Sequence, residues 1–359
     1  MNGVSTVMGT VWKAIHWLER RIWPLVVLVL LVLPLERDLP PPGALATGVD
    51  RIVAGWRFNF WGWQVEVVWD KFTHWLLQPQ RYMSEADRSA FVGDYAARLS
   101  DIRDLQGRIA VLYADPTVAN PTEATAELHA EWLRLREQAE ARRPLTEAIL
   151  EEQVGVILAE EGLGRLGQPW PPVGARFTPL PYLLVVSPRE RIETALQRDL
   201  QPGLDLARQE AIEEHIDASL DHSSLVTAIG GLSAWPAMLL EHPDLTWIVE
   251  VTAHEWTHHA LGFHPLGWEY DRSREARTIN ETTASIVGKE VGRRVLARYY
   301  PHLLPLQEQA SPPQTETARP PAFDFRAEMY QTRVEVDRLL AEGRIAEAEQ
   351  YMEERRQFF

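Results

Sequence analysis

The sequence contains no cysteine among its 359 residues. This absence excludes disulfide bonds, thiol catalysis and any zinc site with cysteine ligands. An excess of positive charge is also missing, since the formal net charge is −15. Phosphate binding draws on clustered Lys and Arg, so we expect no nucleic-acid partner. Any bound metal must therefore be held by histidine and carboxylate ligands.

The apolar run near the N-terminus, Ile22 to Leu35, is short. Its 14 residues span about 21 Å as a helix, less than the roughly 30 Å hydrocarbon core of a bilayer. Lys13, Arg20 and Arg21 precede it, which places the N-terminus inside and the rest of the chain outside. We expect an uncleaved membrane anchor with an extracytoplasmic main part. A secreted protein after signal cleavage, or a buried core helix, are the alternatives.

Tryptophan is concentrated at the same end of the chain. Eight of the 14 Trp lie within the first 75 residues, and Trp favours the membrane–water interface. The stretch 56–77 could form an amphipathic helix lying in that interface. The sequence is equally compatible with a Trp-rich helix that packs on the rest of the protein. Residues 1–80 are thus predicted to form a membrane anchor and a Trp-rich interfacial segment.

Residues 81–167 are predicted to form a helical hairpin. Ser84 can cap a helix that ends at Asp115, and Pro121 can open a second helix that runs to Arg143. The spacing favours a separate third helix over Leu145–Glu161. We find no chemistry-bearing motif in this part, so a spacer or a docking arm is expected.

Residues 168–359 are predicted to form one domain of the α+β class. It begins with Gln168 to Pro181, which holds five prolines and reads as a linker or a wrapping loop. Apolar strands are expected at Tyr182–Ser187, Leu225–Ile229 and Ala237–Leu240. No internal repeat is visible.

The chemistry is concentrated in a helix that Asp244 can cap and that extends to Leu261. Within it stands His254-Glu255-Trp256-Thr257-His258. Histidines four residues apart lie on one helix face, so both imidazoles can reach a single ion. The Glu255 carboxylate lies beside them, where it can deprotonate a metal-bound water. We expect the histidine stripe to face inward; two core histidines bonded to backbone carbonyls are the alternative.

A third ligand is expected from the helix at 278–292. Glu281 shares a stripe with Ser285, Gly288 and Gly292, and small residues allow two helices to approach closely. A carboxylate buried there would be costly unless it bound a cation. A solvated Glu281 on the outer face is the alternative. Weaker candidates for the third ligand are Glu269, Glu275 and Glu290.

These motifs resemble the zincin metallopeptidases over about 60 residues. The window Val251 to Ala260 is similar to the extended zincin signature, and Asn280-Glu281-x-x-Ala284 is similar to the gluzincin branch, here in a membrane-associated bacterial form. The resemblance implies a Zn²⁺ cofactor held by the two histidines and the glutamate. It also implies a mostly helical domain with a small mixed sheet, whose edge strand holds a peptide. Either Leu225–Ile229 or Ala237–Leu240 could be that strand.

The sequence departs from the family pattern at two points. Ser285 stands where some gluzincins have an acidic residue that orients a zinc-bound histidine. The transition-state donor of the family is usually Tyr or His, and several positions could provide it. The C-terminal stretch resembles bacterial predicted aminopeptidases, and Arg333 there could bind a substrate carboxylate or form a surface ion pair. The candidates for the donor are Tyr270, Tyr299, Tyr300, His302 and Tyr330.

The sequence therefore predicts zinc-dependent hydrolysis of a peptide or protein substrate. A membrane-tethered scaffold that keeps the fold without catalysis is the main alternative, and a structural zinc site is a weaker one. An intramembrane protease is excluded, because Asp244, Glu250 and Glu255 interrupt the helix and no long apolar run surrounds it.

Overall fold

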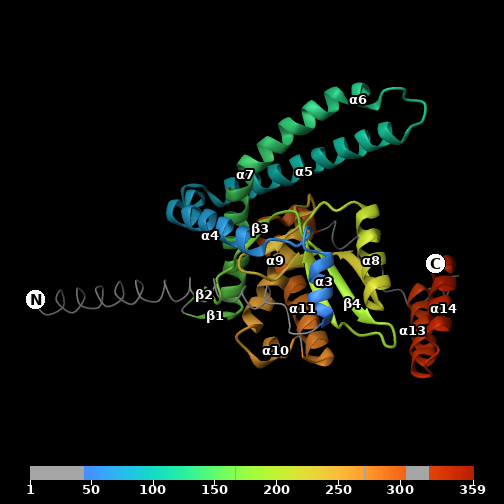
Figure 1. The fold of residues 1–359 in the computed structure, drawn as a ribbon. Helices are drawn as coiled ribbons and strands as arrows, with labels where there is room; N and C mark the ends of the chain where they lie inside the picture. The colour runs from blue at the N-terminus through green and yellow to red at the C-terminus, as the bar shows by residue number, and fades with distance from the viewer. Residues whose placement is uncertain (1–43, 166, 271, 305–322) are drawn as a thin grey trace, which may run out of the picture.

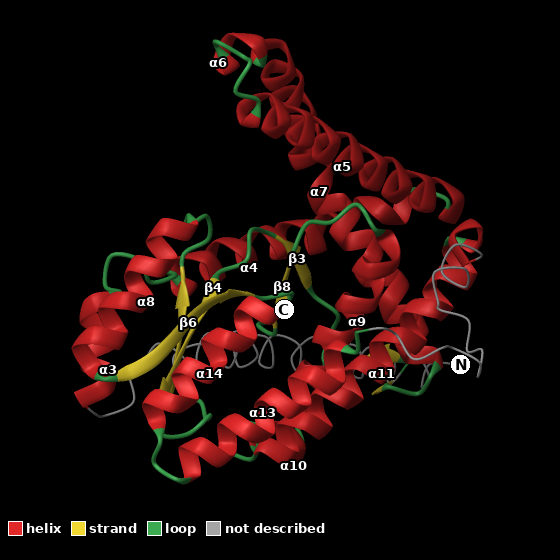
Figure 2. Ribbon diagram, turned by 90° about the vertical axis from the view of Figure 1, so that its right-hand side faces the viewer, coloured by secondary structure: helices red, strands yellow, loops and turns green. Residues whose placement is uncertain are grey.

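The computed structural model describes residues 44–165, 167–270, 272–304 and 323–359 (Figure 1). Helices dominate and the strands form small sheets (Figure 2), so the predicted α+β class is confirmed. The helices are α3 (Ala44–Ile52), α4 (Phe60–Leu77), η1 (Pro79–Tyr82), α5 (Glu85–Ala114), α6 (Pro121–Ala124), α7 (Ala126–Glu160), α8 (Leu206–Leu220), α9 (Leu245–Leu261), α10 (Pro265–Trp268), α11 (Arg274–Tyr299), η2 (Pro301–Leu303), α13 (Phe325–Ala341) and α14 (Ile345–Phe358). The strands are β1 (Gly164–Arg165), β2 (Gln168–Pro169), β3 (Ala175–Phe177), β4 (Tyr182–Pro188), β5 (Leu196–Leu200), β6 (His222–Ala228), β7 (Gly231–Leu232) and β8 (Ala237–Leu239).

The predicted membrane anchor, Ile22–Leu35, lies outside the described residues. In the part of the chain that the structure describes, no helix has the length and apolar character needed to cross a membrane.

The long helices α5 and α7 form an antiparallel hairpin that projects from the rest of the molecule (Figure 1). The Ser84 side chain caps α5 by accepting a hydrogen bond from the amide of Asp87. The predicted break before Leu145 is wrong, because α7 continues through Pro144 to Glu160. Proline removes one helical hydrogen bond, but the half of α7 beyond it is held by deep burial in the core.

The segment predicted as a proline-rich linker contains a buried strand, and that prediction is wrong for residues 175–177. Ala175 pairs in parallel with Ala237, so β3 joins β8 and β7 in a mixed sheet of order β3-β8-β7. The amides of Ala175 and Phe177 each donate to a carboxylate of α7, at 2.8 Å. The hairpin and the mixed sheet are thereby joined by hydrogen bonds between backbone and side chain.

The second three-stranded sheet is antiparallel, in the order β5-β4-β6. Its inner face packs on α3 and α8 around Leu184, Leu200 and Ile216. Residues 57 and 58 extend the outer edge of β5, since the Phe58 amide donates to the carbonyl of Asp199 at 2.9 Å. The face of this sheet that is turned away from α3 and α8 lies opposite the helix pair α9–α11, and residues of both line one cleft.

One hydrophobic core connects the base of the hairpin with the mixed sheet and with α9 and α11. It includes Leu150 and Leu158 of α7, Ile248 of α9 and Leu296 of α11, all at most 1% exposed. The helices α13 and α14 have a small cluster of their own. The main core fixes the helices that carry the candidate site.

Candidate metal centre

Helix α9 forms as its local sequence predicts. The Asp244 side chain accepts hydrogen bonds from the amides of Thr246 and Trp247, and the helix ends at Gly262. The face of α9 that carries the histidines is not turned into the core, as we expected from the sequence. The core side of α9 carries Ile248 and Trp256, whereas the histidine stripe is half-buried and lines a cleft.

Helix α11 approaches α9 closely through the predicted stripe of small residues. A Cβ atom at Gly288 would lie 2.8 Å from the carbonyl oxygen of Glu250, and one at Gly292 would lie 2.6 Å from the Glu250 Cγ. Real Cβ contacts are longer than this, so only glycine permits the observed distance between the helix axes. The close approach brings Glu281 opposite the two histidines.

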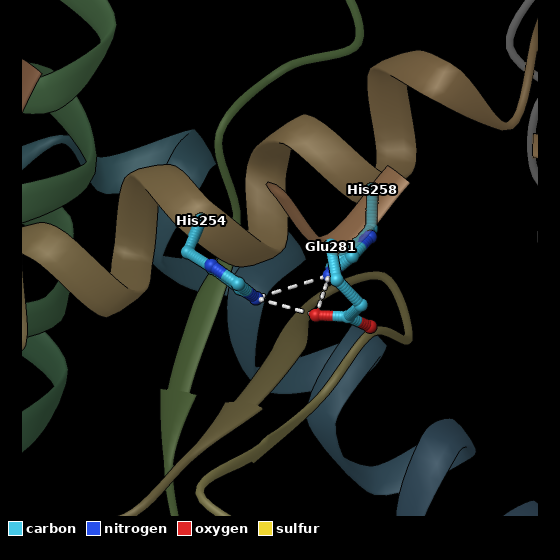
Figure 3. Close-up of side chains that lie close together, drawn as sticks. All are labelled: His254, His258 and Glu281. Atoms are coloured by element: carbon cyan, nitrogen blue, oxygen red, sulfur yellow. Dashed lines mark hydrogen bonds and ion pairs between the residues drawn. The ribbon is translucent and has the colours of Figure 1, made fainter. Parts of the chain in front are cut away.

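Three side chains converge from the two helices, as Figure 3 shows. The Nε2 atoms of His254 and His258 are 3.0 Å apart, and Glu281 Oε2 lies 3.5 Å and 3.6 Å from them. Zinc binds histidine nitrogen and carboxylate oxygen at about 2.0–2.2 Å, which places tetrahedral ligand atoms roughly 3.3–3.5 Å from one another. The three separations lie within about 0.3 Å of this range, so a single ion could bridge the three atoms. The predicted ligands lie together and could hold a metal.

Glu281 is less buried than expected, because 43% of its side chain is exposed. The prediction that it packs against the neighbouring helix is wrong. The small residues that follow it, at Gly288 and Gly292, make that helix contact instead, and Glu281 extends into the cleft. A ligand on the cleft wall leaves room for a further molecule beside the ion, as a catalytic site requires.

Asn280 provides the orienting contact that Ser285 cannot supply. Its Oδ1 lies 2.7 Å from His258 Nδ1, and the Asn280 side chain is buried at 2% exposure. A neutral imidazole that offers Nε2 to a metal carries its proton on Nδ1, so that N–H donates to Asn280 Oδ1. The contact fixes both the ring orientation and the tautomer of His258.

Burial lowers the pKa of His254 below its ordinary value, and the neighbouring His258 lowers it further. Both effects disfavour the imidazolium form, although the Glu281 carboxylate opposes them. A neutral imidazole is the form that binds a metal. The site is therefore poised for a cation.

Glu255 is buried at 6% exposure and lines the same cleft as the two histidines. Across from it, Gly231 of β7 comes so close that a Cβ there would overlap the Glu255 carboxylate. The strand thus holds the carboxylate in place on the floor of the cleft. Its role as a general base stays a prediction.

Tyr270 is the only one of the five candidate donors that reaches the site. Its hydroxyl donates to Glu281 Oε1 at 2.5 Å, and its ring lies edge-on to that of His258, with the centroids 6.0 Å apart. Tyr300 donates instead to Gln153, on the core side of α7. The lining of the cleft includes none of the other three candidates, Tyr299, His302 and Tyr330.

The weaker ligand candidates lie away from the centre. Glu275 accepts a hydrogen bond from Ser273 at 3.0 Å, while Glu269 and Glu290 pair with arginines. Arg333 forms an exposed pair with Asp337 at 2.7 Å, which agrees with the surface alternative.

The cleft has a volume of about 970 Å³ and runs between the two layers of the fold. One wall carries the metal-site residues, and the other is formed by β5 and the segment that contains Phe58. Residues 229–233, which include the edge strand β7, complete the lining. The expectation that Ala237–Leu240 is an edge strand is wrong, because β8 is the middle strand of its sheet. The other candidate strand, Leu225–Ile229, corresponds to β6, an edge of the antiparallel sheet. Of that predicted range only Ile229, which follows β6, lines the cleft.

Sequence reasoning missed the role of Asn280 and the contact of Tyr270 with Glu281. The sequence signal for Asn280 was its position directly before Glu281, which places its side chain next to α9 as well. Comparison of the chain with protein-family models, curated proteins and solved structures finds no match, so the interpretation of this centre rests on its own geometry.

Proposed function

We propose that this chain is a zinc-dependent peptidase of the zincin kind. The observation that carries the proposal is the convergence of His254, His258 and Glu281 within 3.0–3.6 Å of one another, on the wall of a cleft that Glu255 also lines. A structural zinc site would not need a buried carboxylate beside an open cleft. Zinc, when bound, supplies a Lewis acid that activates water and polarises the scissile carbonyl.

Each side chain has a distinct task in this proposal. Glu255 accepts the proton of the attacking water and passes it to the leaving amine, the role of a general base that becomes a general acid. Tyr270, beside Glu281 and His258, can donate its hydroxyl proton to the oxygen that becomes negative in the transition state. Its hydrogen bond to Glu281 holds the phenol near that position.

The cleft also offers a place for an extended peptide. Strand β7 pairs with β8 on one side only, and the residues around it line the cleft. A substrate strand can add to such an edge through its own backbone hydrogen bonds. This arrangement supports a peptide substrate over a small polar metabolite.

The test compares two variants of the full chain. Glu255→Gln keeps all three ligands, so we expect about one zinc per chain with cleavage of a peptide library lost. His258→Ala removes a ligand, so both zinc and cleavage are lost. Glu275→Gln, on an exposed part of α11, is the matched control and is expected to keep both.

Two outcomes would contradict the proposal. Full cleavage by Glu255→Gln would remove the assigned base. Absence of zinc in the unmodified chain after zinc loading would favour the membrane-tethered scaffold instead.

A further inference from the structure

Helix α4 presents an apolar stripe to solvent. Val65, Trp69, Phe72 and Leu76 follow one another at steps of four, three and four, so they lie along one face of the helix. Their exposures are 56%, 67%, 49% and 67%. Single exposed apolar residues are common, but a contiguous stripe of this size marks an interaction surface.

The opposite face of α4 is polar where it meets the protein. Gln64 donates to the carbonyl of Trp235 at 2.6 Å, and its side chain is buried. Lys71 lies 2.8 Å from Glu147 and 2.7 Å from Glu151, beneath the hairpin. The same face also buries the apolar residues Phe60 and Val67, which are 5% and 1% exposed. A surface helix normally turns its apolar face inward, whereas α4 has apolar residues on both faces and leaves a stripe of them in solvent.

These inner contacts mean that the stripe is held in its exposed position. A fully formed Lys71 ion cluster with two carboxylates resists rotation of α4, because rotation would leave buried charges without partners. Glu66 is the charged residue on the outer face. Asp70, at its margin, is paired with Arg176 at 3.1 Å.

The end of α4 carries residues that favour the zone of lipid headgroups. Arg81 and Tyr82 follow it in η1, and Tyr82 is 90% exposed. Tyr and Trp prefer the membrane–water interface, and Arg extends its charge toward the headgroups. Figure 1 shows α4 at the margin of the molecule, beside the base of the hairpin.

The sequence before the described residues supplies the independent argument. Ile22–Leu35 is an uninterrupted run without charge, preceded by Lys13, Arg20 and Arg21. We interpret this segment from its sequence as a membrane anchor, and the inference for α4 builds on that interpretation. Only eight residues separate it from the start of α3 at Ala44, a distance of at most about 29 Å even when fully extended.

We propose that α4 lies in the interface of a lipid bilayer and inserts the stripe Val65, Trp69, Phe72 and Leu76 between the lipid headgroups. The helix would set the orientation of the folded part against the membrane, while the apolar run 22–35 provides the attachment. This inference does not depend on the metal centre. It assigns a lipid surface as the partner of α4.

The absence of cysteine makes the test direct, because a single introduced thiol can be labelled alone. Val65→Cys and Phe72→Cys variants of the full chain would carry a nitroxide label and be reconstituted into phosphatidylcholine–phosphatidylglycerol vesicles. Val111→Cys and Leu133→Cys are the matched controls, since these apolar residues are 67% and 60% exposed on the hairpin. Collision rates with oxygen and with a water-soluble nickel complex report lipid and water contact, respectively.

We expect the ratio of oxygen to nickel collisions to be raised at positions 65 and 72 relative to both hairpin positions. Nickel collisions at 65 and 72 as frequent as at the controls would overturn the proposal, because the stripe would then face water. Low collision rates with both reagents would also overturn it. That result would mean that a protein surface, such as a second copy or residues 22–35, covers the stripe.

Discussion

Replacing Asn280 with alanine tests the least expected part of the metal centre. Asn280 Oδ1 accepts a hydrogen bond from His258 Nδ1 at 2.7 Å, and the asparagine is almost fully buried. The substitution leaves the Nδ1 proton without its acceptor and allows the imidazole to turn. It does not remove a ligand.

The expected effect can be derived from that one contact. Loss of a partner that orients a metal ligand typically weakens metal binding about 10- to 100-fold. This corresponds to roughly 1.4–2.7 kcal/mol, close to the roughly 1–3 kcal/mol for a buried donor left without an acceptor. We therefore expect the zinc Kd of Asn280→Ala to rise by one to two orders of magnitude, as measured by competition with a fluorescent chelator.

Two further variants separate orientation from packing. Asn280→Asp restores an acceptor of similar shape, so its zinc affinity should equal or exceed that of the unmodified chain. Thr278→Ala removes an exposed hydroxyl from the same helix and should change nothing, since that hydroxyl bonds only to the carbonyl of Arg274. If alanine and aspartate weaken zinc binding equally at position 280, the argument from the hydrogen bond is refuted.

Four other substitutions test the packing and the buried charges of the fold. Gly288→Ala places a Cβ 2.8 Å from a carbonyl oxygen of α9, so we expect a loss of about 1–3 kcal/mol in the free energy of unfolding together with weaker zinc binding. Gly93→Ala, where a Cβ meets nothing within 4 Å, should instead gain about 0.5–1 kcal/mol in denaturant titrations. Lys71→Met leaves Glu151 of α7 without its cation, although Glu147 keeps Arg143 at 3.6 Å and Arg176 at 3.9 Å, and should cost about 3 kcal/mol in the same measurement; a change below 1 kcal/mol would contradict a tightly held α4. Burial lowers the pKa of His259 to about 4 in the folded chain, whereas an unfolded chain has the ordinary histidine pKa of about 6.5. Between these two pH values the unfolded chain binds one more proton than the folded chain, so protonation favours unfolding. Stability should decline across that window by up to about 3 kcal/mol, and a His259→Phe variant should lose this component of the pH dependence.

Helices with local start and stop signals could be predicted from the sequence. Asp244 starts α9 through a side-chain cap that acts within one turn of the chain, and Gly262 directly follows the last residue of the helix. Ser84 acts in the same way at the start of α5. These signals need no information from distant residues.

Elements that depend on distant residues could not be predicted. Pro144 reads as a helix boundary, yet Ile149 and Leu150 lie in the core and hold α7 in one piece. Strand β3 is only three residues long, and it forms because carboxylates of α7 and the backbone of β8 receive its hydrogen bonds. Buried and more exposed residues alternate along β5, as in an ordinary strand, but the charged residues Arg198 and Asp199 hide the alternation of apolar and polar residues in the sequence.

The candidate site also combines features that the local sequence predicts with features that depend on distant residues. The residue types and their spacing predicted that His254, His258 and Glu281 would meet, and in the structure they do. The exposure of Glu281 and the contact of Asn280 depend on how α11 is rotated against α9. A pattern along one helix does not fix that rotation.

The rotation is set by residues that carry no chemistry. At Gly288 and Gly292 the backbone of α11 contacts Glu250 and His254, so the two helices meet at the one place where no Cβ stands between them. Any larger residue there would push α11 outward, and the Glu281 carboxylate would move away from both imidazoles. The distances of 3.5 Å and 3.6 Å that suit a single ion are therefore a consequence of glycines about two and three turns further along the helix. In the proposed zinc centre, metal affinity would therefore depend on helix packing, and a substitution outside the three proposed ligands, such as Gly288→Ala, would weaken metal binding.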